Sequence, residues 1–275
     1  MERRGKTKLP TYQSTQLPGP SASPRLRAEI ADYYKAVLAR WGPQNWWPAQ
    51  SRLEVIVGTY LTQNTNWSNV EKAMANLRAA RVLSIQGLRN ISLEQLQQLI
   101  RPSGYFRQKA EKLKTFIHFL DASYSGSLNR MFAQPTAKLR AELLALNGVG
   151  PETADSILLY AGNHPVFVVD AYTRRIFERH GIISAKTRYD EIRLLIEHAL
   201  KNGSVEQLTI QELGSDPRHP VSRMSRMSRS ELAQHYNELH ALIVRTGNVY
   251  CRSTARCEGC PLHQFLNSSA KQQAR

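Results

Sequence analysis

Apolar side chains recur along most of this chain at the three- and four-residue spacing of helices that bury one face. In the helix expected at residues 230–247, Leu232, Tyr236, Leu239 and Leu242 form such a stripe. The same spacing predicts helices within residues 25–41, 53–62, 67–80, 107–120, 139–146, 151–161 and 183–200, and two shorter ones within 82–100. The folded part of the chain is therefore predicted to be helical.

Two glycines interrupt the helical pattern of residues 139–161. Gly148 and Gly150 tolerate backbone angles that other residues avoid, and Pro151 can open a new helix because its missing N–H is not needed there. We expect a helix, a glycine hairpin and a second helix, followed by an apolar run that ends at Asp170. Backbone N–H groups at a helix start bind anions such as phosphate. A tight helix–helix connection without a ligand explains the glycines equally well.

The balance of charge points to a polyanionic partner. The 275 residues carry a net charge of +15, with an isoelectric point near 10.0. Nucleic acid is the first candidate and an acidic membrane the second, while a merely basic protein is the alternative. No apolar run approaches the ~18 residues needed to span a bilayer, and the N-terminus lacks the apolar core of a secretory signal. We expect a protein of the cytoplasm or nucleoid without a membrane partner.

Three segments differ from the rest in composition. Residues 1–24, rich in proline, serine and glycine, are predicted to form a disordered basic tail, and residues 267–275 a second tail. Residues 202–229 contain a Ser-Arg repeat, SRMSRMSRS, and are predicted to be a flexible insertion. This insertion is either an electrostatic arm or a neutral linker.

The three cysteines, Cys251, Cys257 and Cys260, lie within ten residues of one another. Such clustering argues against a disulfide framework and indicates a metal site.

Several motifs in the same order resemble the helix-hairpin-helix (HhH-GPD) DNA glycosylases of the endonuclease III superfamily. The hairpin sequence LNGVGPETAD is followed by VVDAY at residues 168–172, and the resemblance runs from about Trp46 to Leu262. It implies an all-α fold of two subdomains with double-stranded DNA bound between them. Residues 53–165 would form a six-helix barrel that includes the hairpin of residues 139–161. Residues 25–52 and 166–266 would form the second subdomain, and a monomer is expected.

The resemblance implies a damaged base flipped out of duplex DNA and a carboxylate beside its sugar. Asp170 matches the catalytic position, where a carboxylate would stabilise positive charge on the sugar or activate water. A helix N-cap is the alternative role for this residue. Gln63 matches the residue that fills the space left by the flipped base. The other implied DNA contacts are Asn147, Gly148, Val149, Gly150 and Thr153.

Two further groups of residues have two interpretations each. Trp46 and Trp47 are expected either to pack on the core or to line a pocket for the flipped base. Lys109, Lys112 and Lys114, in the helix at residues 107–120, are expected to face solvent or phosphate.

Members of the family that also cut the DNA strand carry a lysine two residues after the second hairpin glycine. Here Glu152 stands there, and a carboxylate cannot form an imine. We therefore predict a monofunctional glycosylase, similar to the branch that acts on alkylated purines such as 3-methyladenine. One alternative is a bifunctional glycosylase and lyase for oxidised pyrimidines, using Lys109, Lys186 or the N-terminus. The other is a damaged-DNA-binding module without catalysis.

The cysteine segment resembles the loop that holds a [4Fe–4S] cluster in the endonuclease III superfamily. The expected fourth cysteine is replaced by Leu266, which cannot bind iron, and His263 lies close to it in sequence. Three readings stay open. The cluster is held by three cysteines with His263 or an outside ligand, the same four residues bind zinc, or the loop holds no metal.

Overall fold

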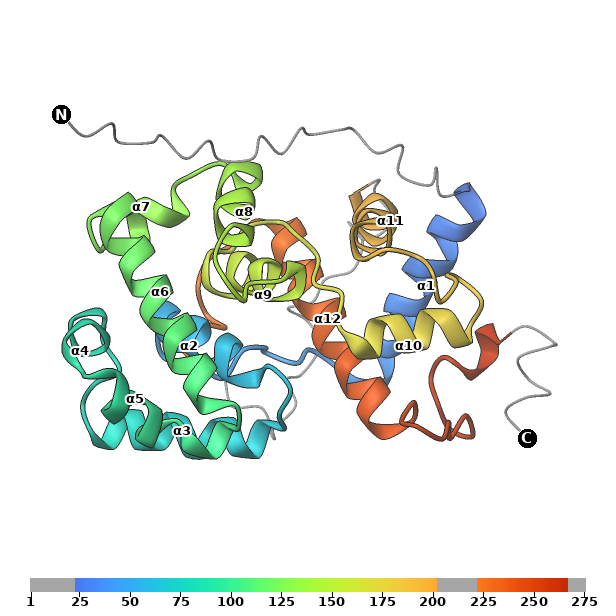
Figure 1. Cartoon of the computed structure of the whole chain (residues 1–275). Coiled ribbons are helices and arrows are strands. Elements are labelled where there is room, and N and C mark those ends of the chain that lie inside the picture. The colour runs from blue at the N-terminus through green and yellow to red at the C-terminus, as the bar shows by residue number, and fades with distance from the viewer. Residues whose placement is uncertain (1–22, 202–221, 267–275) are drawn as a thin grey trace.

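Helices form nearly all the regular structure of this protein. The computed structural model describes residues 23–201 and 222–266 (Figure 1). Within those ranges there is no named β-strand, which confirms the all-α prediction. The helices are α1 (Pro24–Trp41), α2 (Arg52–Thr62), α3 (Trp67–Ala79), α4 (Ile85–Asn90), α5 (Leu93–Leu99), η1 (Arg101–Ser103), α6 (Phe106–Tyr124), α7 (Leu128–Phe132), α8 (Thr136–Leu144), α9 (Pro151–Ser156), the π-helical η2 (Ile157–Ala161), α10 (Ala171–Arg179), α11 (Tyr189–Lys201), α12 (Glu231–Val249) and η4 (His263–Phe265).

Short polar side chains determine where many of these helices begin. Ser51, Asn66 and Ser230 each accept a hydrogen bond from the backbone N–H three residues ahead, at the starts of α2, α3 and α12. Ser92 and Gln95 form a complete capping box at α5. These caps satisfy N–H groups that have no partner inside the helix, so the helix starts follow from local sequence.

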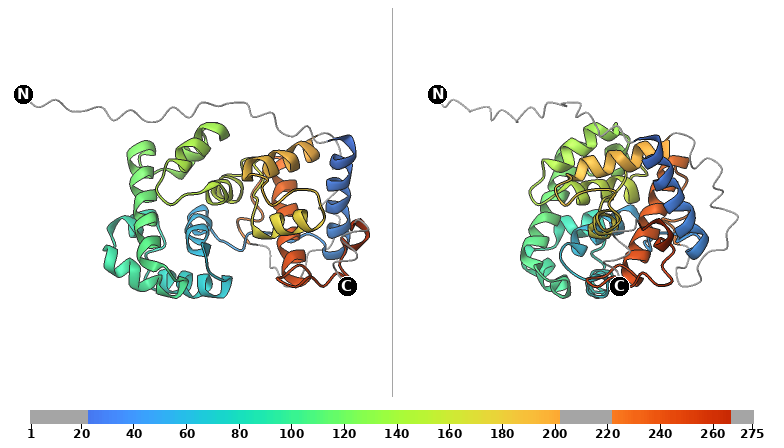
Figure 2. Two further views of the ribbon diagram at one scale, coloured as in Figure 1. Left: turned by 45° about the vertical axis from the view of Figure 1, so that its right-hand side comes forward. Right: turned by 90° about the vertical axis from the view of Figure 1, so that its right-hand side faces the viewer.

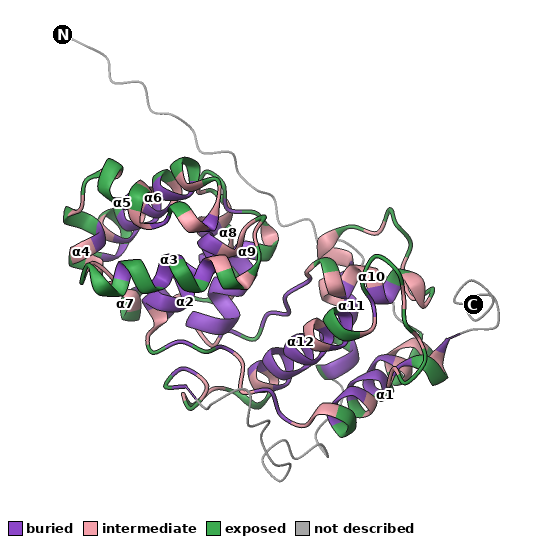
Figure 3. Ribbon diagram, turned by 90° about the horizontal axis from the view of Figure 1, so that it is seen from below, coloured by how far each residue is buried: buried purple, intermediate pink, exposed green. Residues whose placement is uncertain are grey.

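The helices gather in two groups that can be followed in Figures 1 and 2. In the first group, α2 contacts α3, α6, α9 and η2, and its residues 53–61 are all buried, so it forms the centre of this group. In the second group, α1 contacts α11 and α12, and α10 also packs on α12. Contacts between α12 and η2 join the two groups, and buried residues line their facing sides (Figure 3).

An extended segment, residues 166–170, leads from the first group into the second. The apolar side chains of this segment are buried. Two side chains of α11 accept hydrogen bonds from its backbone. Glu197 accepts a hydrogen bond from Phe167 N at 3.0 Å, and Tyr189 Oη accepts one from Val169 N at 3.2 Å. Both bonds position Asp170 at the end of the segment.

The structure corrects several expectations. Helix α11 begins at Tyr189 because a turn at residues 184–187 precedes it, and α7 was not expected. Lys109, expected at the surface, is 1% exposed. Residues 222–229 are not a free arm, because Ser222 Oγ donates to Trp47 O at 2.7 Å and Met224 is buried. Residues 1–22 and 267–275 of the predicted tails, and residues 202–221 of the predicted insertion, lie outside the described residues. Residues 23 and 24, which were assigned to the first tail, form the start of α1.

Candidate active site

The glycine hairpin between α8 and α9 makes room for a lysine of another helix. Gly148 has a φ of +77°, and a Cβ atom there would lie 2.2 Å from Cε of Lys112 in α6. A side chain at this position would therefore be strained and would collide with Lys112. Gly150 caps α9 from an open position, with nothing within 4 Å of where its Cβ would be. The positive φ at Gly148 therefore favours glycine, and a side chain there would also displace the flexible end of Lys112.

Gln63, at the C-terminus of α2, joins this hairpin through its side-chain amide. Its Nε2 donates to Thr153 Oγ1 at 2.9 Å and to Gly148 O at 3.3 Å. Its Oε1 accepts from Lys112 Nζ at 2.7 Å. Three residues predicted as DNA contacts, Gln63, Gly148 and Thr153, therefore lie together, and Lys112 adds a positive charge to them.

The other hairpin residues have different surroundings. Asn147 is exposed next to this cluster. Val149 is 7% exposed, packs on the core and donates its N–H to Leu146 O, so that N–H is already used within the hairpin. Any backbone contact of the hairpin with phosphate would therefore involve neighbouring amides.

Asp170 caps α10 and also keeps one carboxylate oxygen outside that cap. Oδ1 accepts hydrogen bonds from Thr173 N at 2.7 Å and Thr173 Oγ1 at 2.9 Å. Oδ2 lies 3.8 Å from Nε2 of His240 on α12, and the Asp170 side chain is 13% exposed. The N-cap role is thus real, and the arrangement orients the carboxylate and leaves Oδ2 available.

His240 and Tyr160 lie behind this carboxylate. Tyr160 Oη is hydrogen-bonded to His240 Nδ1, and His240 Nε2 is buried without a hydrogen-bond partner. Burial lowers the pKa of His240, and the charge of Asp170 acts in the opposite direction. The imidazole is therefore neutral at neutral pH, with its free nitrogen facing Asp170.

Glu152, in the first turn of α9, is the second acidic group at this site. The residue is exposed on the surface, yet desolvation of its carboxyl group and the charge of Asp170 raise its pKa to about 7. No amine stands at this position.

The tryptophans expected in a base pocket belong to an aromatic cluster beside Tyr160. Trp47 is 8% exposed, and its ring lies 5.1 Å from Tyr160 and 5.4 Å from Trp67. Trp46 is half-buried, at 5.8 Å from Trp47. Trp47 therefore packs in the core, whereas the edge of the cluster at Trp46 reaches the surface. A role in base binding stays a prediction for both.

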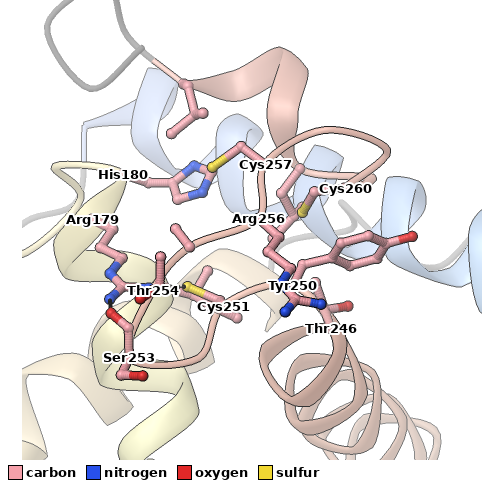
Figure 4. A pocket seen from close by; sticks show the side chains of 14 residues that line it. Arg179, His180, Thr246, Tyr250, Cys251, Ser253, Thr254, Arg256, Cys257 and Cys260 are labelled. Atoms are coloured by element: carbon pink, nitrogen blue, oxygen red, sulfur yellow. Dashed lines mark hydrogen bonds between the residues drawn. The ribbon is translucent and has the colours of Figure 1, made fainter. Parts of the chain in front are cut away.

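The three cysteines line one cavity between α10, α12 and the segment that follows α12 (Figure 4). The cavity measures about 360 Å³, and Arg179, His180 and Leu266 also contribute to its wall. Arg179 Nη1 donates to Cys251 Sγ at 3.2 Å and to Arg252 O at 2.8 Å. Burial raises the pKa of the Cys260 thiol to about 11, so this thiol is not an activated nucleophile.

His263, expected as the fourth ligand, is exposed in η4 and is not part of the cavity wall. Among residues 23–201 and 222–266, no three His, Cys, Asp or Glu side chains are arranged to hold a single metal ion. Neither zinc nor an iron–sulfur cluster, two of the three readings of this loop, is therefore shown in this part of the chain. Nor is any described helix both long and apolar enough to cross a bilayer.

A family model matches residues 57–202, more than half of the chain, and describes base excision DNA repair proteins of the HhH-GPD superfamily. The chain belongs to this superfamily. A Methanocaldococcus jannaschii protein named as a candidate DNA repair glycosylase is 42% identical over 87% of this chain and 96% of its own length. Endonuclease III of Thermotoga maritima is 33% identical over 48% of this chain and 58% of its own length.

Solved structures of HhH-GPD proteins have the same fold. The 3-methyladenine DNA glycosylase of H. pylori, bound to 1,N6-ethenoadenine, has a TM-score of 0.65 at 28% identity, over 81% of this chain and 97% of that one. An endonuclease III–DNA complex has a TM-score of 0.67 at 18% identity, over 90% and 99%. Family and relatives together confirm the predictions of the superfamily and of a DNA N-glycosylase.

Sequence reasoning did not identify some residues of this HhH-GPD site. His240 lies 3.8 Å from Asp170 and Tyr160 is hydrogen-bonded to His240, but neither residue was singled out from the sequence. His180 was not considered at all, although it lines the cysteine cavity. Each comes from a helix distant in sequence from its partner, so no spacing along the chain marks it.

Proposed function

We propose that this protein is a monofunctional DNA glycosylase that hydrolyses the N-glycosidic bond of an alkylated purine flipped out of duplex DNA. The observation that carries the proposal is the pair at the start of α9 and α10. Asp170 presents an oriented carboxylate oxygen, and Glu152 occupies the position where a lyase would need an amine.

Asp170 would act on the sugar. As the bond to the base breaks, positive charge develops on the deoxyribose ring, and a fixed carboxylate lowers the energy of that state. Two hydrogen bonds from Thr173 hold Oδ1, so the carboxylate does not have to reorganise during the reaction. The low polarity around Tyr160 and His240, both buried, strengthens the interaction relative to water.

With Glu152 at this position, the reaction would proceed without a covalent enzyme–DNA intermediate. A carboxylate with a pKa raised to about 7 accepts a proton from water near neutral pH, which suits a general base. Water rather than an amine then attacks the sugar and leaves an abasic site. Of the other amines considered, Lys109 is buried and donates to Leu61 O at 2.8 Å and Ser103 O at 2.6 Å, so it is already bound within the protein.

The substrate class follows from the leaving group and the aromatic cluster. An alkylated purine already carries positive charge, so it departs with little help from a protein acid. Trp46 lies at the surface end of the aromatic cluster, and the π face of a tryptophan ring attracts a cationic base. The relative that supports this class is the H. pylori glycosylase, named for 3-methyladenine and bound to 1,N6-ethenoadenine.

DNA would lie across the hairpin and Gln63. The hairpin backbone around Gly148 and Gly150, at the start of α9, and the ammonium of Lys112 would contact phosphate. Gln63 would have to leave its bonds to Gly148 and Thr153 in order to enter the duplex. The positive charge of the whole chain favours association with DNA.

The test measures free bases released from duplex DNA that carries either methylated purines or oxidised pyrimidines. Wild type, Asp170→Asn and Asp32→Asn are compared, because Asp32 is a carboxylate exposed on α1. We expect release of methylated purines without strand cleavage by wild type and Asp32→Asn, and loss of release in Asp170→Asn. Release of oxidised pyrimidines alone would contradict the substrate, and strand cleavage would contradict the monofunctional mechanism. Tight DNA binding without any release would favour the binding-module alternative.

A further inference from the structure

We propose that His180 is the fourth protein ligand of a [4Fe–4S] cluster held in the cysteine cavity, in place of the cysteine that Leu266 replaces. His180 directly follows α10, whereas Asp170 caps the other end of that helix. The inference therefore concerns a different site from the proposed glycosylase chemistry and does not depend on it.

The size of the cavity and the placement of its donors fit a multi-iron cluster. A water molecule takes about 30 Å³ in the liquid, so a cavity of about 360 Å³ is much larger than one ion needs. The sulfur atoms of Cys251, Cys257 and Cys260 come from separate points of the wall (Figure 4). Donors spread around a volume fit a cluster of several irons, and they also explain why no three described side chains converge on a single ion.

Arg179 prepares one of the three thiols for a negatively charged state. Its guanidinium donates to Cys251 Sγ at 3.2 Å and to the backbone oxygen of Ser253 at 2.7 Å. Arg175 donates to Cys251 O at 2.9 Å. Hydrogen bonds to ligating sulfur stabilise the thiolate, and these two arginines also fix the loop that carries it.

His180 is the available donor that completes the set. Its Nδ1 is hydrogen-bonded to Tyr33 Oη at 2.6 Å, and the two rings meet edge to face at 5.3 Å, so the imidazole has one orientation. In that orientation Nδ1 is engaged by the tyrosine and Nε2 is left for the cavity. A ligating histidine commonly uses its second nitrogen in this way to bind an orienting partner.

The other two candidates for the fourth position do not fit. Leu266 lines the same cavity but has no donor atom. His263 has a donor but is exposed and is not part of the cavity wall. Imidazole replaces cysteine in other iron–sulfur centres, so a histidine ligand is chemically reasonable.

The experiment compares wild type, His180→Ala, His180→Cys and His263→Ala, all purified and reconstituted with iron and sulfide without oxygen. Iron and acid-labile sulfide are counted, and the reduced proteins are examined by pulsed electron paramagnetic resonance for coupling to a ligating nitrogen. We expect about four irons and four sulfides per chain in wild type and His263→Ala, with nitrogen coupling in both. We expect no nitrogen coupling in His180→Ala, which loses one iron on mild oxidation. His180→Cys retains the fourth iron without nitrogen coupling.

Each contrary result overturns the proposal. The absence of a cluster in wild type after reconstitution would mean that the cavity does not bind an iron–sulfur cluster. Nitrogen coupling that survives in His180→Ala but disappears in His263→Ala would assign the ligand to His263. Thermal unfolding of all four proteins controls for misfolding, and His180→Cys keeps the test decisive if the alanine variant is unstable. Base release by the same samples is recorded separately, so a failure of the glycosylase proposal does not affect this readout.

Discussion

Replacing Arg140 by alanine should destabilise the protein far more than replacing an arginine in a similar but exposed ion pair. Arg140 of α8 binds Asp155 of α9 through two hydrogen bonds, Nε to Oδ1 at 2.7 Å and Nη2 to Oδ2 at 3.1 Å. The Asp155 side chain is fully buried and that of Arg140 is 15% exposed. Arg140 also binds Asp190 of α11 at 2.7 Å, so one guanidinium joins three helices.

The magnitude follows from the charge that would be left behind. Arg140→Ala leaves the Asp155 carboxylate buried without the cation that pairs with it, with the hydroxyl of Tyr189 as a remaining hydrogen-bond partner. Breaking a buried ion pair in this way costs about 3–5 kcal/mol. Arg89 and Asp121 make the same two-bond contact, at 2.8 and 2.6 Å, but their side chains are 38% and 32% exposed. Arg89→Ala should therefore cost far less than Arg140→Ala, because water replaces the lost partner at this exposed pair.

The effect should also depend on pH in a defined direction. Burial raises the pKa of Asp155 above its usual value, while Arg140 opposes that rise. Removing Arg140 raises the pKa further, so the unfolded state loses the proton first as pH increases, and stability is lost through that interval. The loss of unfolding free energy in Arg140→Ala should thus be smaller at about pH 5 than at about pH 7. At the higher pH the folded variant must either keep an unpaired buried charge or hold a proton that the unfolded chain has released.

Urea unfolding of wild type, Arg140→Ala and Arg89→Ala, followed by circular dichroism at both pH values, gives the free energies directly. The m value must stay constant for the comparison to hold. The reasoning is refuted if Arg140→Ala costs no more than Arg89→Ala. It is also refuted if the deficit grows as the pH is lowered.

Three further changes probe the site and its support. Glu152→Lys should give a covalent adduct with abasic DNA that borohydride traps, whereas wild type gives none, and absence of the adduct would contradict the placement of residue 152 beside the sugar. His240→Phe should lower the single-turnover rate of base release about tenfold with DNA affinity unchanged, because the buried nitrogen facing Asp170 is lost. Lys109→Met should cost about 1–3 kcal/mol by leaving the Leu61 and Ser103 carbonyls unbonded. Because burial and Lys112 lower the pKa of Lys109 to about 8, the stability difference between wild type and Lys109→Met should widen between about pH 8 and 10, and a constant difference would contradict that pKa.

The hairpin could be predicted from the sequence because its determinants are local. Glycine at Gly148 permits the positive φ, and Pro151 opens α9 at a position where no N–H is needed. Helix starts at Ser92 and Ser230 follow from the same kind of information, since a cap needs only residues within three positions. The N-cap role of Asp170 belongs to this class too.

The surroundings of these local features could not be predicted in the same way. Lys109 looks like a surface lysine in its helical pattern, yet carbonyl oxygens at the ends of α2 and η1 accept its hydrogen bonds inside the core. The sequence alone does not show which histidine lies beside the cysteines. The packing of α10 against α12 places His180, and not His263, in the wall of the cysteine cavity. Spacing along the chain carries no information on which distant helix will face a given side chain.

Helix α10 provides a physical link between the two sites. It spans nine residues, about 13 Å at 1.5 Å per residue, with Asp170 at its N-terminus and His180 at its C-terminus. Its packing on α12 is shared by both sites, because α12 carries His240 and leads directly into Cys251. A cluster bound to His180 and the cysteines would therefore fasten both helices at one end and leave Asp170 and His240 aligned at the other. On this view the cluster affects base release by holding α10 and α12 in place, and not by redox chemistry. Loss of the cluster should therefore lower the thermal stability and reduce the difference in the rate of base release between wild type and His240→Phe.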